Sequence, residues 1–226
     1  MTTYELAIVG GGASGLAAAV MARRLGASTV LLERGARVGK KLLATGNGRC
    51  NLTNTSASPA DYFGGVPVMA GAMAAFPPAS VMDFFESLGI LCLKTRGARV
   101  FPLCDQASAV LDALRYAVSE SGGEILCGFE AVRIEKKDVF RIASADGRQV
   151  AARRVILATG GPASPSVGGT DAGFALFRQM NHRITRLLPA LTQLETMVEP
   201  IRALKGIRID GGISLLLSGR PVPSDS

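Results

Sequence analysis

The sequence has 226 residues, 48% of them hydrophobic and 19% charged, a composition that indicates a core-forming globular protein and excludes a disordered one. The formal net charge is +7 and both halves share it: residues 1–120 carry 11 basic and 8 acidic groups, and residues 121–226 carry 14 and 10. A single histidine and four cysteines without a C-x-x-C pair argue against a zinc site.

The chain opens with the order strand, glycine turn, helix, strand and acid, which is the fingerprint of a dinucleotide-binding unit. The pattern comprises a strand at 6–9, the glycines Gly10, Gly12 and Gly15, a helix at 16–25, a strand at 28–32 and the acid Glu33. Glycines allow the tight turn and the close approach of a pyrophosphate, which the helix N-terminus attracts, and the acid accepts hydrogen bonds from a ribose. The pattern predicts binding of an adenine dinucleotide, either FAD or NAD.

A second concentration of glycines, bases and polar side chains follows at residues 36–54, ARVGKKLLATGNGRCNLTN. Because it comes directly after the ribose-binding acid, it is predicted to fold over a pyrophosphate or a flavin; the alternative is a polar surface loop. Residues 55–78 have no clear period and predict a loop with at most a short helix.

Between residues 80 and 122 the sequence predicts two helices that flank a hairpin. The elements are a helix at 81–88, strands at 91–94 and 99–101, and a helix with the apolar stripe Val110, Leu111, Leu114, Ala117 and Val118. Ser80, with Asp83 completing a capping box, is predicted to cap the first helix, and Asp105 or Ser108 the second.

From residue 124 the pattern changes to short strands. They are predicted at 124–127, 131–135, 139–143 and 149–152, with a tight turn at Asp146–Gly147. We expect a three-stranded antiparallel unit inserted into a parallel sheet, which the chain rejoins with a strand at 155–158. The glycines Gly160 and Gly161 then offer a second close approach of backbone to a ligand; the alternative is a simple turn. A helix at 171–181 follows, and His182 is predicted to be a helix-end residue rather than a catalytic base.

These elements define an α/β fold: a Rossmann-like FAD/NAD(P)-binding domain with an inserted antiparallel β unit, plus the start of a second β-rich domain. The expected boundaries are 1–190 and 191–226. Strand-like residues 207–209 and 213–217, with a Gly211–Gly212 turn between them, carry the second domain.

Three stretches together resemble the BaiN-like, aminoacetone-oxidase-type FAD-dependent oxidoreductases, and more broadly flavoproteins of the glutathione reductase and fumarate reductase type. They are AIVGGGASGLAAAVMARRLG with VLLER, GKKLLATGNGRCNLTN, and VILATGGPASPSVGGTDAGFALFRQMNH with PAL. The resemblance implies that FAD is bound by Gly10, Gly12, Ala13, Ser14, Gly15, Glu33 and Arg34 at its ADP half, by Lys41, Thr45, Gly46, Gly48, Arg49, Cys50 and Asn51 at the pyrophosphate and isoalloxazine, by the backbone of Val132 at the adenine, and by Ala158, Thr159 and Gly160. Family members usually carry a glycine where Asn47 stands.

The resemblance implies an FAD-dependent oxidoreductase that acts on a small molecule, with NAD(P)H as electron partner. Arg49 and Lys41 are candidates for a cation beside the flavin, whereas no catalytic acid or base is predicted. Cys50 lacks the neighbouring cysteine of a disulfide reductase. Three alternatives remain open: an NAD-dependent dehydrogenase, a nucleic-acid-linked flavoprotein, and an inactive fragment of a flavoprotein.

Relatives of this kind are longer, so the resemblance also implies that the chain lacks the C-terminal completion of its FAD domain. The N-terminus has no basic leader, and no apolar run reaches the about 18 residues of a membrane span. A cytoplasmic protein with no membrane and no nucleic-acid partner is therefore expected, whereas its oligomeric state is not predicted.

Overall fold

The computed structural model describes residues 2–62, 65–188, 199–204, 214, 216–217 and 220–221. The chain divides into two compact units, Met1–Ile184 and Thr185–Ser226, which are described separately. In the second unit the described elements are the 3-10 helix η4 (Glu199–Leu204) and an antiparallel pair, β10 (Leu216–Leu217) with β11 (Arg220–Pro221). The strand predicted at 207–209 and the Gly211–Gly212 turn lie outside the described residues.

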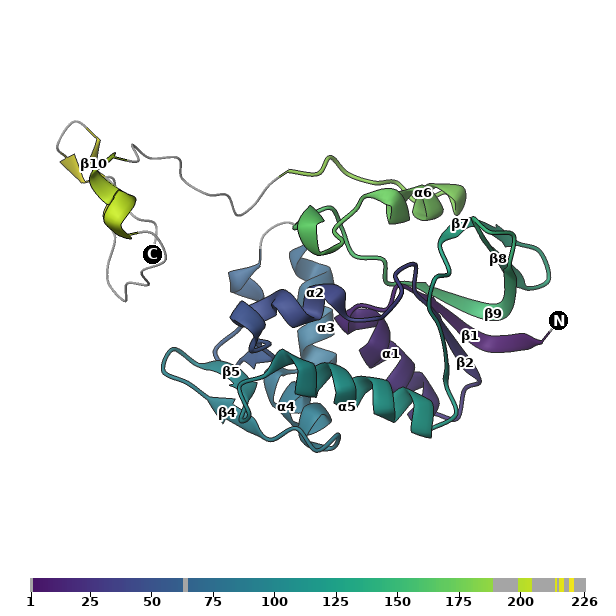
Figure 1. The fold of residues 1–226 in the computed structure, drawn as a ribbon, viewed down its shortest axis with the longest axis horizontal. Helices are drawn as coiled ribbons and strands as arrows, with labels where there is room; N and C mark the ends of the chain where they lie inside the picture. Colours follow the sequence, from purple (N-terminus) through teal and green to yellow (C-terminus); the bar gives the residue numbers. More distant parts are fainter. Residues whose placement is uncertain are drawn as a thin grey trace. The chain divides into compact units, whose positions relative to one another are not determined.

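The first unit is built on one six-stranded sheet with the order β6-β2-β1-β9-β8-β7 (Figure 1). Its strands are β1 (Thr3–Val9), β2 (Thr29–Leu32), β6 (Glu124–Leu126), β7 (Ala131–Lys136), β8 (Phe140–Ser144) and β9 (Gln149–Leu157). The pairs β6–β2, β2–β1 and β1–β9 are parallel, whereas β7–β8 and β8–β9 are antiparallel. The predicted α/β fold with an inserted antiparallel unit is therefore confirmed.

One continuous strand replaces two predicted ones, because β9 runs unbroken through Gln149–Leu157. Its first half pairs with β8, and its pairing with β1 extends from Ala151 to Leu157. Arg153 and Arg154, between the two predicted strands, lie inside β9 with exposed side chains. The prediction of separate strands at 149–152 and 155–158 was wrong, and the antiparallel unit is continuous with the main sheet.

Alternation along the parallel strands separates two hydrophobic cores. Ile8 and Leu31 point to one face, where they pack with α1 (Ala13–Arg24) and α5 (Ala107–Glu120). The predicted stripe of α5 belongs to this core: Val110, Leu111, Leu114 and Val118 are buried, and Ala117 is partly buried. Helix α5 therefore packs on the sheet with the face that its apolar stripe predicted.

The opposite face of the same strands packs against the antiparallel unit. Ala7 and Val30 share the second core with Ile134 of β7 and Ile142 of β8. Helix α6 (Ala172–Gln179) adds Leu176, which is 2% exposed. One face of the parallel strands is therefore covered by α1 and α5, and the other packs against side chains of β7, β8 and α6.

Short elements occupy the chain between β2 and α5, with one more after β9. They are α2 (Lys40–Ala44), η1 (Thr45–Gly48), β3 (Thr53–Asn54), η2 (Pro59–Asp61), α3 (Val66–Ala75), α4 (Pro78–Glu86), β4 (Cys92–Lys94), β5 (Arg99–Pro102) and η3 (Pro165–Val167). Strands β4 and β5 form the predicted hairpin, and β3 adds a third strand in the order β3-β5-β4.

Helix starts were predicted less well than helix interiors. Helix α4 begins at Pro78, because proline is preorganised for the first position of a helix. Ser80 therefore lies inside the first turn of α4 and does not cap it. Helix α5 is preceded by Gln106, and Asp105 has a left-handed φ of +57° that is incompatible with an N-cap. The predicted caps Ser80, Asp105 and Ser108 were therefore wrong.

The prediction of a loop with at most a short helix at 55–78 was also wrong, because α3 spans ten residues. Its sequence, VPVMAGAMAA, combines a proline near the start with strong helix formers, which a search for amphipathic period misses. Among the described residues no single helix could span a membrane; Pro67–Ala75 and Pro78–Glu86, bent by 46°, meet the length and composition only as a pair.

Candidate functional site

The ends of three parallel strands meet at one edge of the main sheet, as the order β2-β1-β9 requires. Gly10, just after β1, donates its N–H to the Leu32 carbonyl at 2.8 Å. Ala158, just after β9, donates to the Val9 carbonyl at 2.7 Å. The glycine loop, the acid after β2 and the second glycine turn are thereby brought together, although they are far apart in sequence.

Two of the fingerprint glycines are required by packing. A Cβ on Gly10 would lie 2.3 Å from the Ala158 carbonyl oxygen, and a Cβ on Gly15 would lie 1.9 Å from the Gly10 carbonyl oxygen. Gly10 also has a φ of +112°, which side chains rarely adopt. These two glycines hold β1, β9 and α1 in close contact.

Gly12 differs, because its backbone faces open space. No described atom lies within 4 Å of a Cβ built on it, and its extended backbone, φ −81° and ψ −173°, suits any residue. Gly12 is also the N-cap of α1, whose first turn has neither a side-chain cap nor an acid. Packing therefore does not explain this glycine, whereas the approach of an anion to the helix N-terminus does.

The carboxylate of Glu33 lies beside the glycine loop. Its Oε2 accepts the N–H of Gly11 at 2.8 Å, and its Oε1 accepts the N–H of Gly35 at 2.6 Å. The two backbone donors orient the side chain, and each oxygen retains further acceptor capacity for a hydroxyl. Glu33 therefore lies beside the glycine loop with the unused acceptor capacity that the predicted contact to a ribose needs.

Two predicted cations hold the segment that follows the second glycine turn. Lys41 Nζ donates to the carbonyl of Ala163 at 2.8 Å and to that of Gly161 at 3.4 Å. Arg34 Nη2 donates to the carbonyl of Gly168 at 2.8 Å. Both side chains therefore lie at the strand edge, and their backbone partners belong to the other glycine-rich segment of the site.

The backbone of residues 45–50 turns repeatedly through left-handed conformations. Gly46, Asn47, Gly48 and Cys50 have φ values of 55°, 56°, 83° and 63°. Asparagine tolerates this region better than most side chains, so Asn47 suits a position where the family resemblance implies glycine. Such a run of unusual dihedrals is typical of a functional loop held by its surroundings.

Cys50 is buried inside this loop, and all four cysteines are free thiols. Burial raises the pKa of the Cys50 thiol, and a hydrogen bond with Thr45 partly offsets this. Thr45 itself donates to the Leu42 carbonyl at 2.6 Å. Cys50 is therefore a protonated thiol that packs, and it lacks the electropositive surroundings of a reactive thiolate.

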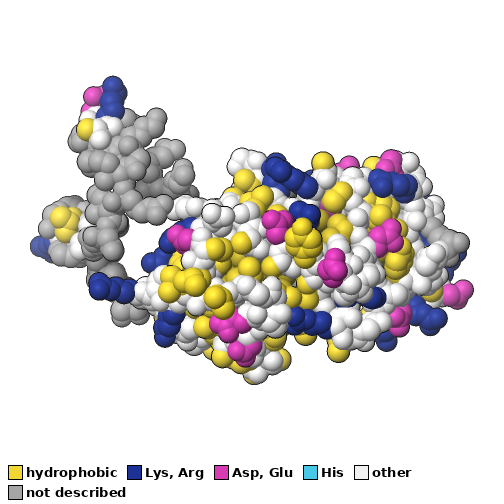
Figure 2. Space-filling view, turned by 60° about the horizontal axis from the view of Figure 1, so that its bottom comes forward, with side chains coloured by type: hydrophobic (Ala, Val, Ile, Leu, Met, Phe, Trp, Pro, Cys, Tyr) yellow, Lys and Arg dark blue, Asp and Glu magenta, His cyan; other side chains and the backbone are white. Residues whose placement is uncertain are grey.

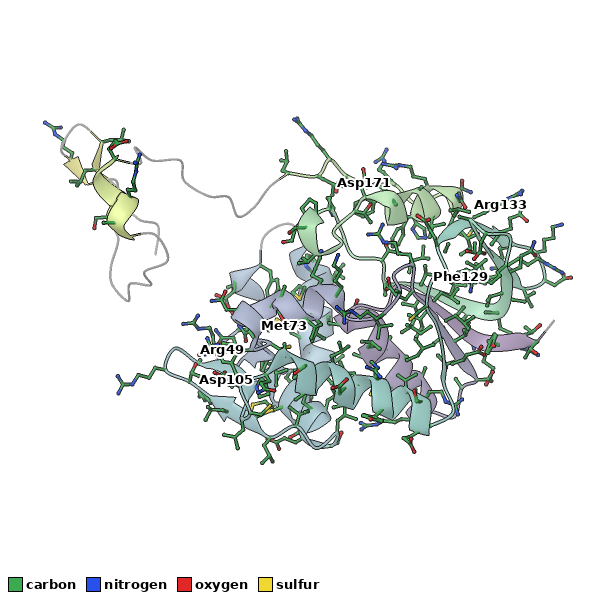
Figure 3. The ribbon with its side chains drawn as sticks, in the orientation of Figure 1. Arg49, Met73, Asp105, Phe129, Arg133 and Asp171 are labelled. Atoms are coloured by element: carbon green, nitrogen blue, oxygen red, sulfur yellow. The ribbon has the colours of Figure 1, made fainter. Side chains whose placement is uncertain are left out.

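Arg49 points away from the glycine loop and packs on the three-stranded sheet. Its guanidinium lies 4.2 Å from the centre of the Phe101 ring, and its Nη1 lies 3.6 Å from Asp105 Oδ1 (Figure 3). Its Nε also donates to the Gly46 carbonyl at 3.3 Å. Arg49 thus connects the 45–50 loop to β5, whereas Asn51 lies exposed just beyond the loop.

Thr159 and Gly160 form the second glycine turn. Thr159 is packed so closely against α6 that a Cβ on Gly173 would lie 2.0 Å from its Oγ1. Among the described residues this buried hydroxyl has no hydrogen-bond partner. Gly160 has a φ of +70° and open space beside its Cα, so the turn presents bare backbone at the edge.

Val132 lies on β7, which is an outer strand of the sheet, at a register shift between Ala131 and Arg133. Its carbonyl accepts Gln179 Nε2 at 3.0 Å, and Gln179 Oε1 accepts the N–H of Ile134 at 2.8 Å. The family resemblance assigns the backbone of Val132 to the adenine, and the carbonyl of that backbone already has a side-chain partner from α6.

Sequence reasoning missed Gln179 and Gly173, whereas Gly39 belongs to the segment 36–54 that it singled out. Gly39 donates its N–H to the Gly11 carbonyl at 2.8 Å, and a Cβ on it would lie 2.3 Å from Leu111 Cδ1. The glycines could have been flagged as candidates for close packing, but their partners are set by the fold. Within the described ranges, no group of three or more His, Cys, Asp or Glu side chains could hold a metal ion.

The glycine loop at a helix N-terminus, the oriented acid and the switch in strand order define a Rossmann-like nucleotide-binding domain. The chain belongs to the HI0933-like protein Rossmann domain family, whose model matches residues 4–217. This confirms the family resemblance predicted from the three motifs.

The curated relatives include a bile acid reductase and two ribosomal RNA dihydrouridine synthases. The chain is 38% identical over 227 aligned residues to a 3-dehydro-bile acid delta(4,6)-reductase of Clostridium scindens, covering 98% of this chain and 55% of that protein. It is 28% and 25% identical to ribosomal RNA dihydrouridine synthases of Haemophilus influenzae and Escherichia coli, covering 79% and 95% of this chain and 46% and 54% of theirs. The chain thus spans about half the length of these relatives.

Solved structures show the same fold at low identity. A flavocytochrome c3 fumarate reductase superposes with a TM-score of 0.59 at 18% identity, over 79% of this chain and 40% of that one. THI4 of Thermovibrio ammonificans superposes with a TM-score of 0.51 at 16% identity, over 72% of this chain and 59% of that one.

Proposed function

We propose that this chain is the nucleotide-binding part of an FAD-dependent reductase. The carrying observation is Gly12, a glycine with open space at its Cα beside the uncapped N-terminus of α1. The residues fit the cofactor: the N–H groups at the start of α1 would hold the pyrophosphate, Glu33 the ribose, and Lys41 the segment that closes over both. The flavocytochrome with the same fold supports FAD over NAD.

The chemistry that FAD supplies when bound is hydride transfer, and we propose NAD(P)H as its source. The names of the curated relatives share one reaction type: saturation of a C=C bond conjugated with a carbonyl, in a 3-keto steroid acid or in the uracil ring. In such a reaction a hydride adds to the carbon distal to the carbonyl, a proton adds to the neighbouring carbon, and NAD(P)H becomes NAD(P)⁺. The relative with 38% identity favours a small steroid-like enone as substrate.

Gly12→Ala tests the cofactor site without disturbing the fold. A methyl group at this position meets no described atom, so the free energy of unfolding of the chain without FAD should fall by no more than about 1 kcal/mol, the cost of alanine in place of glycine at an N-cap. The same methyl group would intrude where a pyrophosphate approaches, so FAD should bind at least about tenfold more weakly, a loss of about 1.4 kcal/mol. Flavin fluorescence quenching and retention of visible absorbance after desalting measure this.

Gly15→Ala is the matched control, because its methyl group would lie 1.9 Å from a backbone oxygen and must destabilise the fold itself. Wild-type chain that binds NADH but no FAD would favour the dehydrogenase alternative. FAD binding by Gly12→Ala at wild-type affinity would contradict the proposed site. Once FAD is bound, anaerobic reduction by NADH or NADPH followed by reoxidation with a steroid dienone or uridine RNA identifies the substrate.

A further inference from the structure

We propose that the free edge of β9, at residues 153–157, pairs with the same edge of a second copy of this chain and forms a two-fold dimer. Strand β8 covers this side of β9 only as far as Ala152, whereas β1 covers the other side as far as Leu157. Among the described residues, those at 153–157 therefore have a strand on one side and none on the other. The proposal does not depend on the cofactor and goes beyond the proposed function.

The backbone groups at this edge point away from β1. Ala158 donates its N–H to the Val9 carbonyl of β1, and the direction of the backbone groups alternates along a strand. Ile156 shares the direction of Ala158, so the N–H and carbonyl groups of Val155 and Leu157 point to the open side. Within the part of the chain that the structure describes, no hydrogen bond satisfies these outward groups.

The other edges of the main sheet are covered or short. On β7, the side chain of Gln179 accepts the N–H of Ile134 at 2.8 Å and donates to the Val132 carbonyl at 3.0 Å. Strand β6, at the opposite edge, has three residues. Sheet edges are commonly protected in such ways, because an unpaired edge is a template for another strand. The described residues provide no such cover for the edge at 153–157.

Apolar side chains flank this edge on both faces of the sheet. On one face, Val155 and Leu157 are partly buried, and they line a groove of about 330 Å³ together with Phe177 and Met180. On the other face, Ile156 is 39% exposed. A strand that adds here would cover these apolar side chains as well as form backbone hydrogen bonds, and both effects favour pairing.

A two-fold axis at Val155 avoids contacts between like charges. In this antiparallel register Val155 of one copy lies opposite Val155 of the other, which matches their outward N–H and carbonyl groups. Arg154 of each copy then lies opposite Ile156 of the other, and Arg153 lies opposite Leu157. An axis at Arg154 would place two arginines opposite each other, which is unfavourable. The edge is therefore complementary to itself, as an isologous dimer requires.

Hydrophobic side chains also gather on the part of the first unit that carries α4 and the β4–β5 hairpin (Figure 2). They include Leu91, Leu93 and Leu103, at 62%, 45% and 55% exposure. Strand β4 has three residues and offers a shorter edge than residues 153–157. This leucine surface is the competing site of association, and a variant there serves as the control.

The test is sedimentation velocity of the cofactor-free 226-residue chain and its variants over a wide range of concentration. Val155→Pro removes an outward N–H and keeps the bonds to β1, because proline is tolerated in a strand where the N–H faces solvent. Ile156→Glu and Ile156→Lys remove the same apolar side chain but place opposite charges across from Arg154 of the second copy. Leu93→Lys is the control on the leucine surface, and circular dichroism checks that every variant is folded.

We expect the wild type to sediment as monomer and dimer, with a dimer fraction that rises with concentration. Val155→Pro should raise the Kd of the dimer at least about tenfold, because the Val155–Val155 pair loses its backbone hydrogen bonds. Ile156→Glu should dimerise at least about tenfold more tightly than Ile156→Lys at low salt, and added salt should reduce this difference. Leu93→Lys should dimerise like the wild type.

A wild type that stays monomeric at every concentration would overturn the proposal and leave the edge to a strand of another polypeptide. Equal Kd values for Ile156→Glu and Ile156→Lys would contradict the register. A dimer that Leu93→Lys loses and Val155→Pro keeps would assign the contact to the leucine surface. If Val155→Pro is unfolded, the comparison of the two Ile156 variants decides. None of these measurements involves flavin, so their failure leaves the proposed function standing.

Discussion

The side chain of Glu33 is held in one orientation by the backbone without any ligand present. Two backbone N–H groups, those of Gly11 and Gly35, fix its carboxylate beside the glycine loop. A carboxylate oxygen has two lone pairs, so these bonds orient the acid without saturating it. A ribose hydroxyl would add to this arrangement, and little side-chain entropy remains to be lost on binding.

The family resemblance suggested that Arg49 is a cation beside the flavin, but its contacts indicate a structural role. It stacks on Phe101 and donates to Gly46, so it braces the left-handed 45–50 loop against β5. Arg49→Lys keeps the charge but loses the planar stack and the Nε bond. We therefore expect Arg49→Lys to weaken FAD binding as much as Arg49→Met, by about three- to tenfold, because both remove an interaction of about 1 kcal/mol.

Phe101→Leu should reproduce this loss, whereas Asp105→Asn should change little, because the Arg49–Asp105 pair is exposed and long. FAD titrations measure the affinity, and limited proteolysis within residues 45–51 of the cofactor-free chain measures the brace directly. If Arg49→Lys retains wild-type affinity and flavin reduction potential while Arg49→Met loses both, the charge itself acts on the flavin and the brace is wrong.

Among the helices and strands, helix α6 packs directly against the second glycine turn through Gly173 and Thr159. A Cβ on Gly173 would lie 2.4 Å from the Cβ of Thr159. Gly173→Ala should therefore cost about 1–3 kcal/mol in the free energy of unfolding, through overpacking. Thr159→Gly removes the Cβ that the new methyl group would meet. The double variant Thr159→Gly/Gly173→Ala should therefore lose less free energy of unfolding than the sum of the losses of the two single variants.

Urea denaturation of the four proteins in this cycle gives the coupling energy. Additive losses would mean that α6 shifts to accommodate the methyl group, and that its distance from the turn is not fixed by Gly173. Gly71→Ala is the matched control, since no described atom lies within 4 Å of a Cβ there and the site is within a helix.

Elements with a strong local signal were predicted from sequence, and those decided by tertiary contacts were not. The β1 strand, the glycine turn and α1 follow from apolar runs and spacing, and the α5 stripe predicted its buried face. The continuity of β9 depends on pairing with β8 and β1 at once, which no local pattern encodes. Two side-chain contacts likewise join residues that are distant in sequence: the hydrogen bonds from Gln179 of α6 to the backbone of β7, and the stacking of Arg49 on Phe101.

Across the whole chain, the described hydrophobic core is confined to the first unit. Every buried hydrophobic residue of the described part lies between Ala7 and Leu176, so the described residues after Ile184 contribute none to it. The first unit, Met1–Ile184, therefore contains the core that a domain needs to fold alone. We expect residues 1–184 to unfold cooperatively, with a Tm within about 3 °C of the full chain, equivalent to less than about 1 kcal/mol at this size.

Differential scanning calorimetry of the two lengths tests this, and FAD titration of both shows whether the cofactor site is contained in the shorter one. Every residue in the proposed contacts to FAD precedes 184, so its affinity should be unchanged within about twofold. A shorter chain that is folded but no longer binds FAD would place part of the site after residue 184. A Tm lower by more than about 6 °C would mean that residues 185–226 stabilise the first unit by about 2 kcal/mol through contacts of their own.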